Sequence, residues 1–158
     1  MANQKTNVMR ILDSTKINYN VYTYDSKGGA IDGISVAEKI GQPVERVYKT
    51  LVTRGNSKNY FVFVIPVNKE LNLKAAAKAV GEKSVEMIRV DEINKVTGYI
   101  RGGCSPIGMK KDYKTVIDKT CSVLDTIIFS GGKIGFQVEV SPKELIEFIK
   151  ADVEQIAE

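Results

Sequence analysis

The sequence contains no histidine at all among its 158 residues. That absence excludes a Ser-His-Asp triad, a Cys-His dyad and general base catalysis by an imidazole. Zinc is also disfavoured, because without histidine the two widely spaced cysteines, Cys104 and Cys121, cannot form a recognisable ligand set. We therefore expect no metal and no other cofactor. Any chemistry must use lysine, carboxylates, hydroxyls, backbone amides or the substrate itself.

Long apolar runs are also missing. No stretch approaches the roughly 18 apolar residues of a membrane-spanning helix, and the opening "MANQKTNVMRILDS" lacks the apolar core of a signal peptide. Two cysteines are too few for a disulfide scaffold and suit a reducing compartment. These absences predict a cytoplasmic protein with no membrane partner.

What is present is typical of one compact domain. Hydrophobic residues make up 43% and charged residues 27% of the chain, so a domain spanning 1–158 can bury a core without disulfides. The net charge of +4 allows an anionic partner without requiring one. A basic patch beside a glycine-rich loop is suited to face phosphates. The positive charges of segment 101–119 are Arg101, Lys110, Lys111, Lys114 and Lys119, against Asp112 and Asp118.

Helical and extended patterns alternate along the first half. Apolar spacing predicts a helix over 4–15, and "YNVYTY" predicts a strand over 19–24 before a loop over 25–33. "TLVTRG" and "YFVFVIP" predict two strands joined by a hairpin turn at "GNSK".

Two short helices are expected between that loop and the hairpin. Ser35 and Glu38 match the S-x-x-E capping box of a helix that Gly41 ends. A second short helix is expected from Pro43 to near Lys49.

The second half continues the mixture. "LNLKAAAKAVG" predicts a helix ended by Gly81, and Asp91 is expected to cap a helix over 92–97. Strands are predicted at 115–118, 126–130 and 136–140, and Ser141 is the expected N-cap of a helix over the last segment, "SPKELIEFIKADVEQIAE". With no repeat and no linker, the chain is expected to be an α+β protein with a mixed, largely antiparallel sheet surrounded by helices.

The stretch "GYIRGGCSPIGMKK" (98–111) allows three functional interpretations. A P-loop fails, because Met109 occupies the lysine position and Pro106 removes an amide. A nucleophilic Cys104 has no base to activate it. A loop acting through backbone N–H groups remains, since Gly102 and Gly103 permit close approach. On spacing alone, tight turns are the favoured interpretation of this loop and of "SGGKIG" (130–135).

Three motifs in order carry a more specific resemblance: "VYKTLV" (47–52), "GYIRGGCSPIGMKK" and "IIFSGGKIGFQVEV" (127–140). Together they resemble the YbaK/EbsC family, whose members are similar to the editing domain inserted in bacterial prolyl-tRNA synthetases. The resemblance covers nearly the whole chain. It implies a barrel-like α+β editing domain and an aminoacyl-tRNA deacylase acting in trans, most typically on Cys-tRNA(Pro).

The resemblance also implies a set of site residues. Lys49 matches the essential family lysine, which positions the aminoacyl ester at the terminal nucleotide. The basic patch is expected to bind the tRNA acceptor end through Arg101, Lys110 and Lys111. The substrate-binding residues implied are Tyr24, Gly102, Gly103, Cys104, Ser105, Pro106, Ser130, Gly131, Gly132 and Gln137.

In the mechanism proposed for the family, the cysteinyl thiol of the substrate attacks its own ester, so no protein nucleophile is needed. Two departures bear on specificity. Gln137 stands where better-known Cys-specific members have aspartate, and segment 25–34 lacks a pocket aromatic residue, with Ile31, Asp32 and Ile34 as the nearest equivalents.

Several alternatives therefore stay open. The chain is either a Cys-specific editor, a deacylase for another amino acid such as alanine, or a tRNA- or synthetase-binding module without turnover. A prolyl-tRNA synthetase complex is a possible source of tRNA specificity. A cell-surface regulatory role is disfavoured, because no export signal is present.

Overall fold

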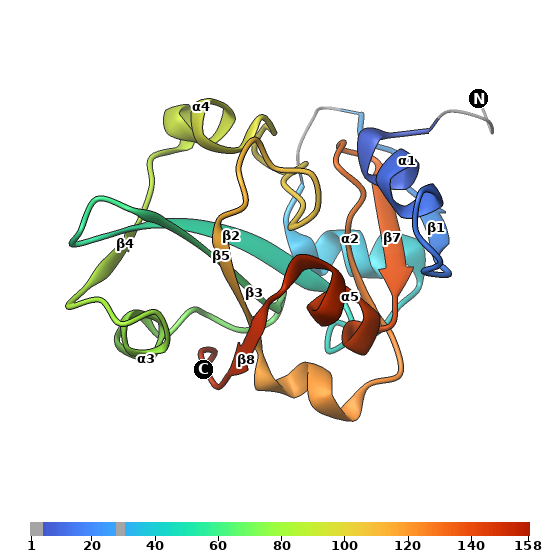
Figure 1. Cartoon of the computed structure of the whole chain (residues 1–158). Coiled ribbons are helices and arrows are strands. Elements are labelled where there is room, and N and C mark those ends of the chain that lie inside the picture. Colours follow the sequence, from blue (N-terminus) through green and yellow to red (C-terminus); the bar gives the residue numbers. More distant parts are fainter. Residues whose placement is uncertain (1–4, 28–30) are drawn as a thin grey trace.

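The computed structural model describes residues 5–27 and 31–158, and over these residues the strands form two sheets (Figure 1). The three-stranded sheet has the order β1-β7-β6, and the five-stranded sheet has the order β4-β2-β3-β5-β8. The mixed α+β prediction is confirmed. The strands are β1 (Asn20–Thr23), β2 (Tyr48–Gly55), β3 (Tyr60–Pro66), β4 (Val85–Met87), β5 (Lys114–Asp118), β6 (Ile127–Ser130), β7 (Phe136–Val140) and β8 (Asp152–Glu154).

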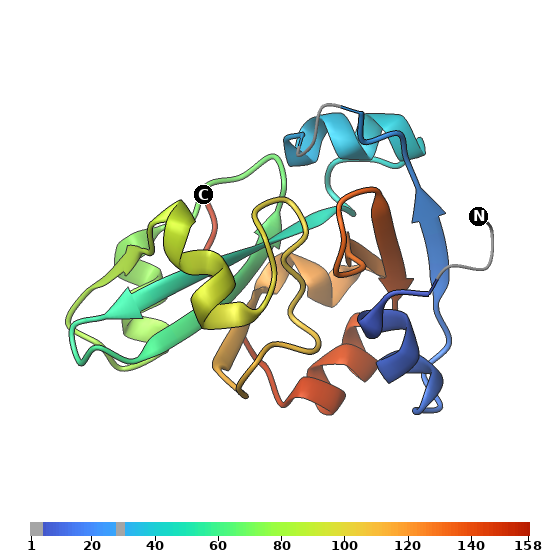
Figure 2. The ribbon, with the colours of Figure 1, turned by 90° about the horizontal axis from the view of Figure 1, so that it is seen from above.

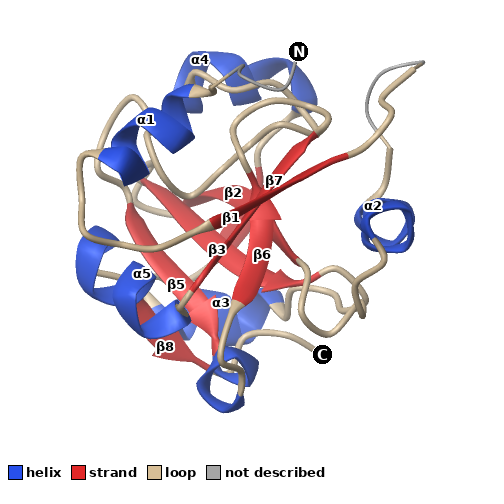
Figure 3. Cartoon of the chain, turned by 90° about the vertical axis from the view of Figure 1, so that its right-hand side faces the viewer, coloured by secondary structure: helices blue, strands red, loops and turns tan. Residues whose placement is uncertain are grey.

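Most strand pairs are antiparallel. The three-stranded sheet is antiparallel throughout, as are the pairs β2–β3 and β2–β4, whereas β3–β5 and β5–β8 are parallel. The two sheets join at an isolated parallel bridge between Val47 and Ile128, where the Ile128 amide donates to the Arg46 carbonyl at 2.9 Å. In Figure 3, β1 and β7 cross in front of β2, β3 and β5, with helices around the outside.

The main core lies between the two sheets. Because side chains alternate along a strand, β2 and β3 direct Tyr48, Val62 and Val64 to one face, against Phe129 and Val138 of the other sheet. All five side chains are buried, and each contributes on the order of 2 kcal/mol through apolar burial. The opposite face of β2 and β3 forms a second cluster covered by α3 (Leu73–Ala79).

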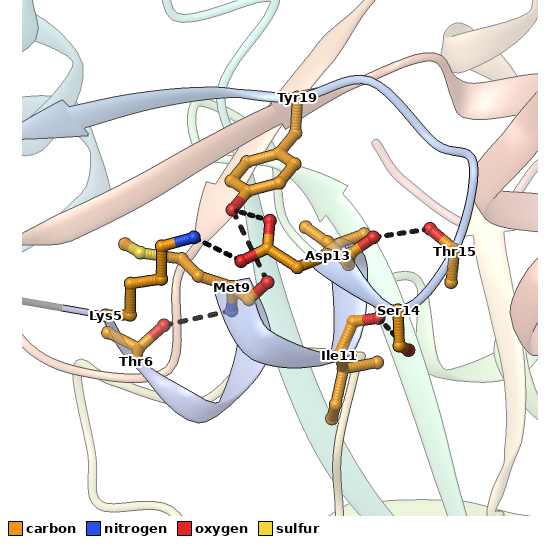
Figure 4. Close-up of polar contacts among 9 residues, drawn as sticks. Lys5, Thr6, Met9, Ile11, Asp13, Ser14, Thr15 and Tyr19 are labelled. Carbon is orange, nitrogen blue, oxygen red and sulfur yellow. Dashed lines mark hydrogen bonds and ion pairs between the residues drawn. The ribbon is translucent and has the colours of Figure 1, made fainter.

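The predicted N-terminal helix is confirmed as α1 (Asn7–Asp13). The Thr6 side chain accepts a hydrogen bond from the Met9 amide at 3.2 Å, which caps the first turn. At the other end, Asp13 accepts a hydrogen bond from the Tyr19 hydroxyl at 2.6 Å and pairs with Lys5 (Figure 4). These contacts fasten α1 to the segment that leads into β1.

Helix α2 (Gly33–Ile40) begins one turn earlier than its sequence suggests. Its N-cap is Asp32, whose carboxylate accepts from the Ser35 amide at 2.9 Å, so the predicted capping box at Ser35 and Glu38 is wrong. The expected end at Gly41 is confirmed by a left-handed backbone there. The predicted loop at 25–33 is described only in part, since 28–30 lie outside the described residues.

The short helix expected from Pro43 to Lys49 is also wrong. The chain makes only a turn, in which the Arg46 amide donates to the Pro43 carbonyl, and β2 then begins at Tyr48. The sequence from 47 to 52 is rich in β-branched and aromatic residues, and it pairs with β3 over its whole length. Lys49 therefore lies on a strand.

Three further boundaries need correction. A 3-10 turn, η1 (Val90–Glu92), precedes α4 (Ile93–Thr97), and Glu92 rather than Asp91 bonds back to the Arg89 amide. Helix α5 (Pro142–Ile149) has the predicted Ser141 cap, but it ends at Lys150, and the chain continues as β8.

The short strand β4 was not predicted. A second 3-10 turn, η2 (Lys119–Val123), follows β5. Over the described residues, no helix is both long and apolar enough to span a membrane.

Candidate active site

A cavity of about 720 Å³ opens where the two sheets separate. Its walls are the start of α2, the strand β2, the segment from β4 to α4, the loop at 101–104 and the adjoining ends of β6 and β7. Figure 2 shows the glycine-rich loop, in yellow to orange, lying between β2 and the β6–β7 turn. Six of the predicted site residues line this cavity: Lys49, Arg101, Gly102, Cys104, Ser130 and Gln137.

One edge of β2 runs along this cavity. The backbone groups of odd-numbered residues of β2 bond to β3. Just before the strand, the Val47 carbonyl accepts from the Val67 amide in the same way. The backbone groups of even-numbered residues therefore point to the other edge of β2. There, Val52 accepts from the Ile88 amide at 3.2 Å. At the other end of this edge, Tyr48 adjoins the bridge to β6, and Thr50, which lies between these two pairings, lines the cavity. The cavity thus runs along this edge of β2.

Lys49, Ser130 and Gln137 project from one face of the strands. The bridge sets Val47 beside Ile128, so Lys49 and Ser130, each two residues further on, share that face. Ser130 is paired with Gln137 across β6 and β7. Lys49 is half-buried, and over residues 5–27 and 31–158 it makes no hydrogen bond or ion pair through its side chain. The strand order therefore brings together three polar residues that are distant in sequence.

The loop at 98–108 is fixed by internal bonds. The hydroxyl of the buried Tyr99 donates to the Ile107 carbonyl, and the Gly103 amide donates to the Ile100 carbonyl at 2.9 Å. A Cβ at Gly103 would lie 3.3 Å from the Ile134 amide nitrogen, so this loop packs directly on the loop at 130–135. Gly103, Ser105 and Pro106 are buried and do not line the cavity.

The loop at 130–135 orients Ser130. The Gly132 amide donates to the Ser130 hydroxyl at 3.1 Å, and Gly132 has a φ of +94°, which favours glycine. The Tyr24 amide donates to the Gly135 carbonyl at 3.0 Å, so Tyr24 adjoins this loop. Tyr24, Gly131 and Gly132 stand behind the cavity wall and do not line it.

The charges that line the cavity are mostly positive. Lys49 and Arg101 supply two cations, whereas Asp32 is occupied as the α2 cap, and hydrogen bonds from the Ser35 amide and hydroxyl lower the pKa of its carboxyl. Burial raises the pKa of the Cys104 thiol to about 11, so Cys104 stays protonated at neutral pH. The site offers cations and backbone donors instead of an activated nucleophile.

The three predicted tRNA-binding residues are separated by the structure. Arg101 is exposed at the cavity, but the Lys110 ammonium donates to the Lys95 carbonyl at 3.2 Å, near the end of α4. Lys111 is exposed and lies away from the cavity lining.

Sequence reasoning missed several cavity residues. Thr50 is the most informative, because its buried hydroxyl finds no partner in the described chain. The predicted strand already began at this residue, but its pattern gave no sign that the hydroxyl would stay unpaired. Of the three residues taken as substitutes for an aromatic residue, Ile31 and Asp32 line the cavity and Ile34 does not. Also missed were Met87, Ile88, Val90 and Ile93, from β4 to α4.

A model of the aminoacyl-tRNA editing domain family matches residues 32–148. The chain belongs to this family. EbsC of Enterococcus faecalis (strain ATCC 700802 / V583), named as a candidate Cys-tRNA(Pro)/Cys-tRNA(Cys) deacylase, is 42% identical over 153 residues, which cover 97% of this chain and 93% of EbsC. The resemblance seen in the three motifs is thereby confirmed.

Two further proteins are similar. The proline–tRNA ligase of Thermosipho melanesiensis (strain DSM 12029 / CIP 104789 / BI429) is 28% identical over 98 residues, which span 62% of this chain but only 17% of the ligase. A crystal structure described as a candidate trans-editing enzyme for prolyl tRNA synthetase superposes with a TM-score of 0.82 at 20% identity, covering 98% of this chain and 99% of the other. That superposition shows a shared fold.

Proposed function

We propose that this editing-domain protein is an aminoacyl-tRNA deacylase that acts in trans on mischarged tRNA, with Cys-tRNA(Pro) as the favoured substrate. The observation that carries the proposal is Lys49, whose side chain has no hydrogen-bond or ion-pair partner among the described residues, in a cavity that it shares with Ser130, Gln137 and a Cys104 thiol that stays protonated. The name of the 42% identical relative supports cysteine as the amino acid removed.

The proposed reaction uses the thiol of the substrate. Its sulfur bonds to the ester carbonyl carbon, the bond from that carbon to the ribose oxygen breaks, and the thiol proton passes to the ribose oxygen. The products are tRNA and a thiolactone. Because the nucleophile and the ester belong to one molecule, the enzyme needs to supply only orientation and charge stabilisation. This requirement suits a site without histidine.

Each wall of the cavity has a role in this proposal. Lys49 positions the ester, and the backbone of the loop at Gly102 stabilises the developing oxyanion. The residues behind the wall hold these groups in place through the packing of the two glycine loops. These supporting residues are Tyr24, Gly103, Ser105, Pro106, Gly131 and Gly132.

The tRNA partner follows from the same arrangement. Arg101 at the mouth of the cavity, with Lys110 and Lys111 further along the loop, is proposed to contact phosphates of the acceptor end in a salt-dependent manner. A prolyl-tRNA synthetase is the proposed partner that supplies tRNA selection, because part of such a ligase is similar to this chain. We propose a cytoplasmic location on the same grounds.

The test is deacylation of Cys-tRNA(Pro) and Ala-tRNA(Pro) by the wild-type protein, Lys49→Ala and Lys78→Ala. Lys78 is an exposed lysine of α3 outside the cavity, so its variant controls for lost surface charge. We expect Lys49→Ala to lower kcat/KM for the cysteinyl ester at least about 100-fold, as loss of a group that stabilises developing charge does, with an unchanged melting temperature. Lys78→Ala should retain full activity.

The other outcomes are equally informative. Lysine-dependent loss of the alanyl ester alone would keep the deacylase and overturn the thiol-assisted step. Binding of tRNA with no hydrolysis of either ester above the buffer rate would contradict both Cys and Ala editing and favour the binding module.

A further inference from the structure

Gln137 presents a buried polar atom to the cavity that nothing in the described chain satisfies. The residue is 6% exposed, and its Oε1 has no hydrogen-bond partner among residues 5–27 and 31–158. Buried side-chain oxygens are nearly always bonded, and leaving one unpaired costs about 1–3 kcal/mol. An unpaired acceptor that lines a cavity indicates a ligand that brings a donor.

The position of Gln137 suggests which donor that is. Gln137 is the cross-strand partner of Ser130 and shares a face with Lys49, the residue proposed above to position the ester. In an aminoacyl ester, the atom next to the carbonyl carbon carries the α-amino group, which holds the N–H donors common to every primary amino acid. The Ser130 oxygen already accepts from the Gly132 amide, whereas Gln137 Oε1 accepts no hydrogen bond within the described residues.

Cations outnumber carboxylates in the lining of the cavity around Gln137. Lys49 on β2 and Arg101 on the loop are positive, and the α2 carboxylate Asp32 is bonded to Ser35. On β7 itself, Glu139 accepts from Tyr22 of β1 and from Thr126 before β6. The nearby Cys104 and Tyr48 are neutral at neutral pH, because burial raises their pKa to about 11 and about 12. No uncommitted carboxylate of the described residues lines the cavity to pair with an ammonium.

We propose that Gln137 is a specificity-determining residue that accepts a hydrogen bond from the α-amino group of the aminoacyl ester, and that the site binds this group in its neutral form. The inference rests on the proposed function and deepens it. An amide oxygen provides the acceptor without adding a charge, whereas a carboxylate at this position would select the ammonium.

The sign of the pH dependence follows directly. A free α-amino group has a pKa of about 7.7–8.0, so below that range most of the substrate carries the ammonium that this site disfavours. Affinity should therefore rise with pH through the pKa of the ligand. A glutamate at position 137 would pair with the ammonium, so its affinity should fall over the same range.

The probes are two hydrolysis-resistant amides, 3′-alanylamido-3′-deoxyadenosine and 3′-lactylamido-3′-deoxyadenosine. They differ only in the titrating amino group, which a hydroxyl replaces in the second. Dissociation constants are measured by NMR titration at about pH 6.5 and about pH 8.5, on either side of the α-amino pKa. The wild-type protein should bind the alanyl probe about tenfold more tightly at the higher pH, with little change for the lactyl probe. Gln137→Glu should reverse the trend for the alanyl probe.

Gln42→Glu is the matched control. Gln42 is a half-buried glutamine outside the cavity lining whose side chain bonds to the Tyr22 hydroxyl at 3.3 Å, so its variant adds the same charge elsewhere. It should leave the wild-type trend unchanged. Affinity of the wild-type protein that does not change with pH, or that changes equally for both probes, overturns the proposal. Deacylation that persists in that case would leave the proposed function standing, whereas absence of both binding and deacylation would remove both. The wild-type measurement requires no variant to fold.

Discussion

Gln137 and Glu139 lie two residues apart on the same face of β7, yet their polar atoms have opposite surroundings. Glu139 accepts hydrogen bonds from Tyr22 at 2.8 Å and from Thr126, and Arg46 is bonded to Thr126 in turn. Gln137 Oε1 has no such partner in the described chain. One end of the face is saturated by the protein, and the other end is left for a ligand.

Along this single strand, Glu139 contributes to stability, whereas Gln137 is proposed to contribute to function. Burial by itself would raise the pKa of Glu139, but hydrogen bonds from Thr126, Tyr22 and Asn20, with Arg46 nearby, lower that pKa below its usual range. A carboxylate satisfied in this way joins the strands of the small sheet to the turn before β2. The unpaired groups at the cavity instead lower the stability of the empty protein, since each lacks a partner.

The largest effect is expected from Glu139→Ala, which leaves the hydroxyls of Tyr22 and Thr126 without their acceptor. The free energy of unfolding should fall by about 2 kcal/mol, measured by urea denaturation. The kcat/KM for Cys-tRNA(Pro) at a temperature well below the transition should stay within about threefold of the wild-type value, since this carboxylate does not line the cavity. A loss of activity as large as that of Lys49→Ala would show that Glu139 serves the reaction as well as stability.

A second expectation concerns acid. Because the folded-state pKa of Glu139 lies below its unfolded value of about 4.3, its charge contributes stability above that pH, and the contribution disappears as the pH falls through the folded-state pKa. The stability difference between the wild-type protein and Glu139→Gln should be constant above about pH 6 and shrink below about pH 4.5. Urea denaturation across this pH range measures it, and a difference that grows toward acid would contradict the assignment.

Gln137→Leu is the converse case. Replacing an unsatisfied buried amide by an apolar group of similar size should raise the free energy of unfolding by up to about 1 kcal/mol, while kcat/KM for the aminoacyl ester falls about tenfold through the lost hydrogen bond. Thermal unfolding and deacylation assays test the two halves together. A clear fall in stability would indicate that Gln137 has a structural partner.

The smallest effect is expected at Thr50. Its hydroxyl is buried and unpaired in the described chain, and valine has nearly the same shape. Thr50→Val should therefore change the free energy of unfolding by less than about 0.5 kcal/mol in the stabilising direction. A substantial loss of deacylation at unchanged stability would add this hydroxyl to the site, and equal activity would exclude it.

Local patterns in the sequence predicted the elements whose signals are local. The hairpin of β2 and β3, the caps at Gly41 and Ser141 and the short apolar period of α1 depend on neighbouring residues alone. The predictions failed where long-range pairing decides. The turn after Pro43 is not a helix because β3 pairs with residues from Tyr48 onward. The chain after Lys150 leaves α5 because β5 offers an edge to β8.

The site follows the same division. Motif resemblance selected Lys49, the two glycine loops and Gln137, and the fold places Lys49, Ser130 and Gln137 on one face. Neither the resemblance nor spacing could reveal that the cavity runs along an edge of β2. That position depends on where β4 stops pairing, next to Ile88, and on where the two sheets separate.

The pairing of β1 with β7 has a consequence for synthesis of the chain. β1 is among the first strands to be made, but its register partners, such as Glu139 for Asn20, come more than a hundred residues later. At ribosomal rates of about 5–20 residues per second, that strand waits several seconds or more for its partner. The hairpin of β2 and β3 needs no such delay. The small sheet, and with it the cavity, is therefore completed last, so an editing site would arise only once nearly the whole chain has been made.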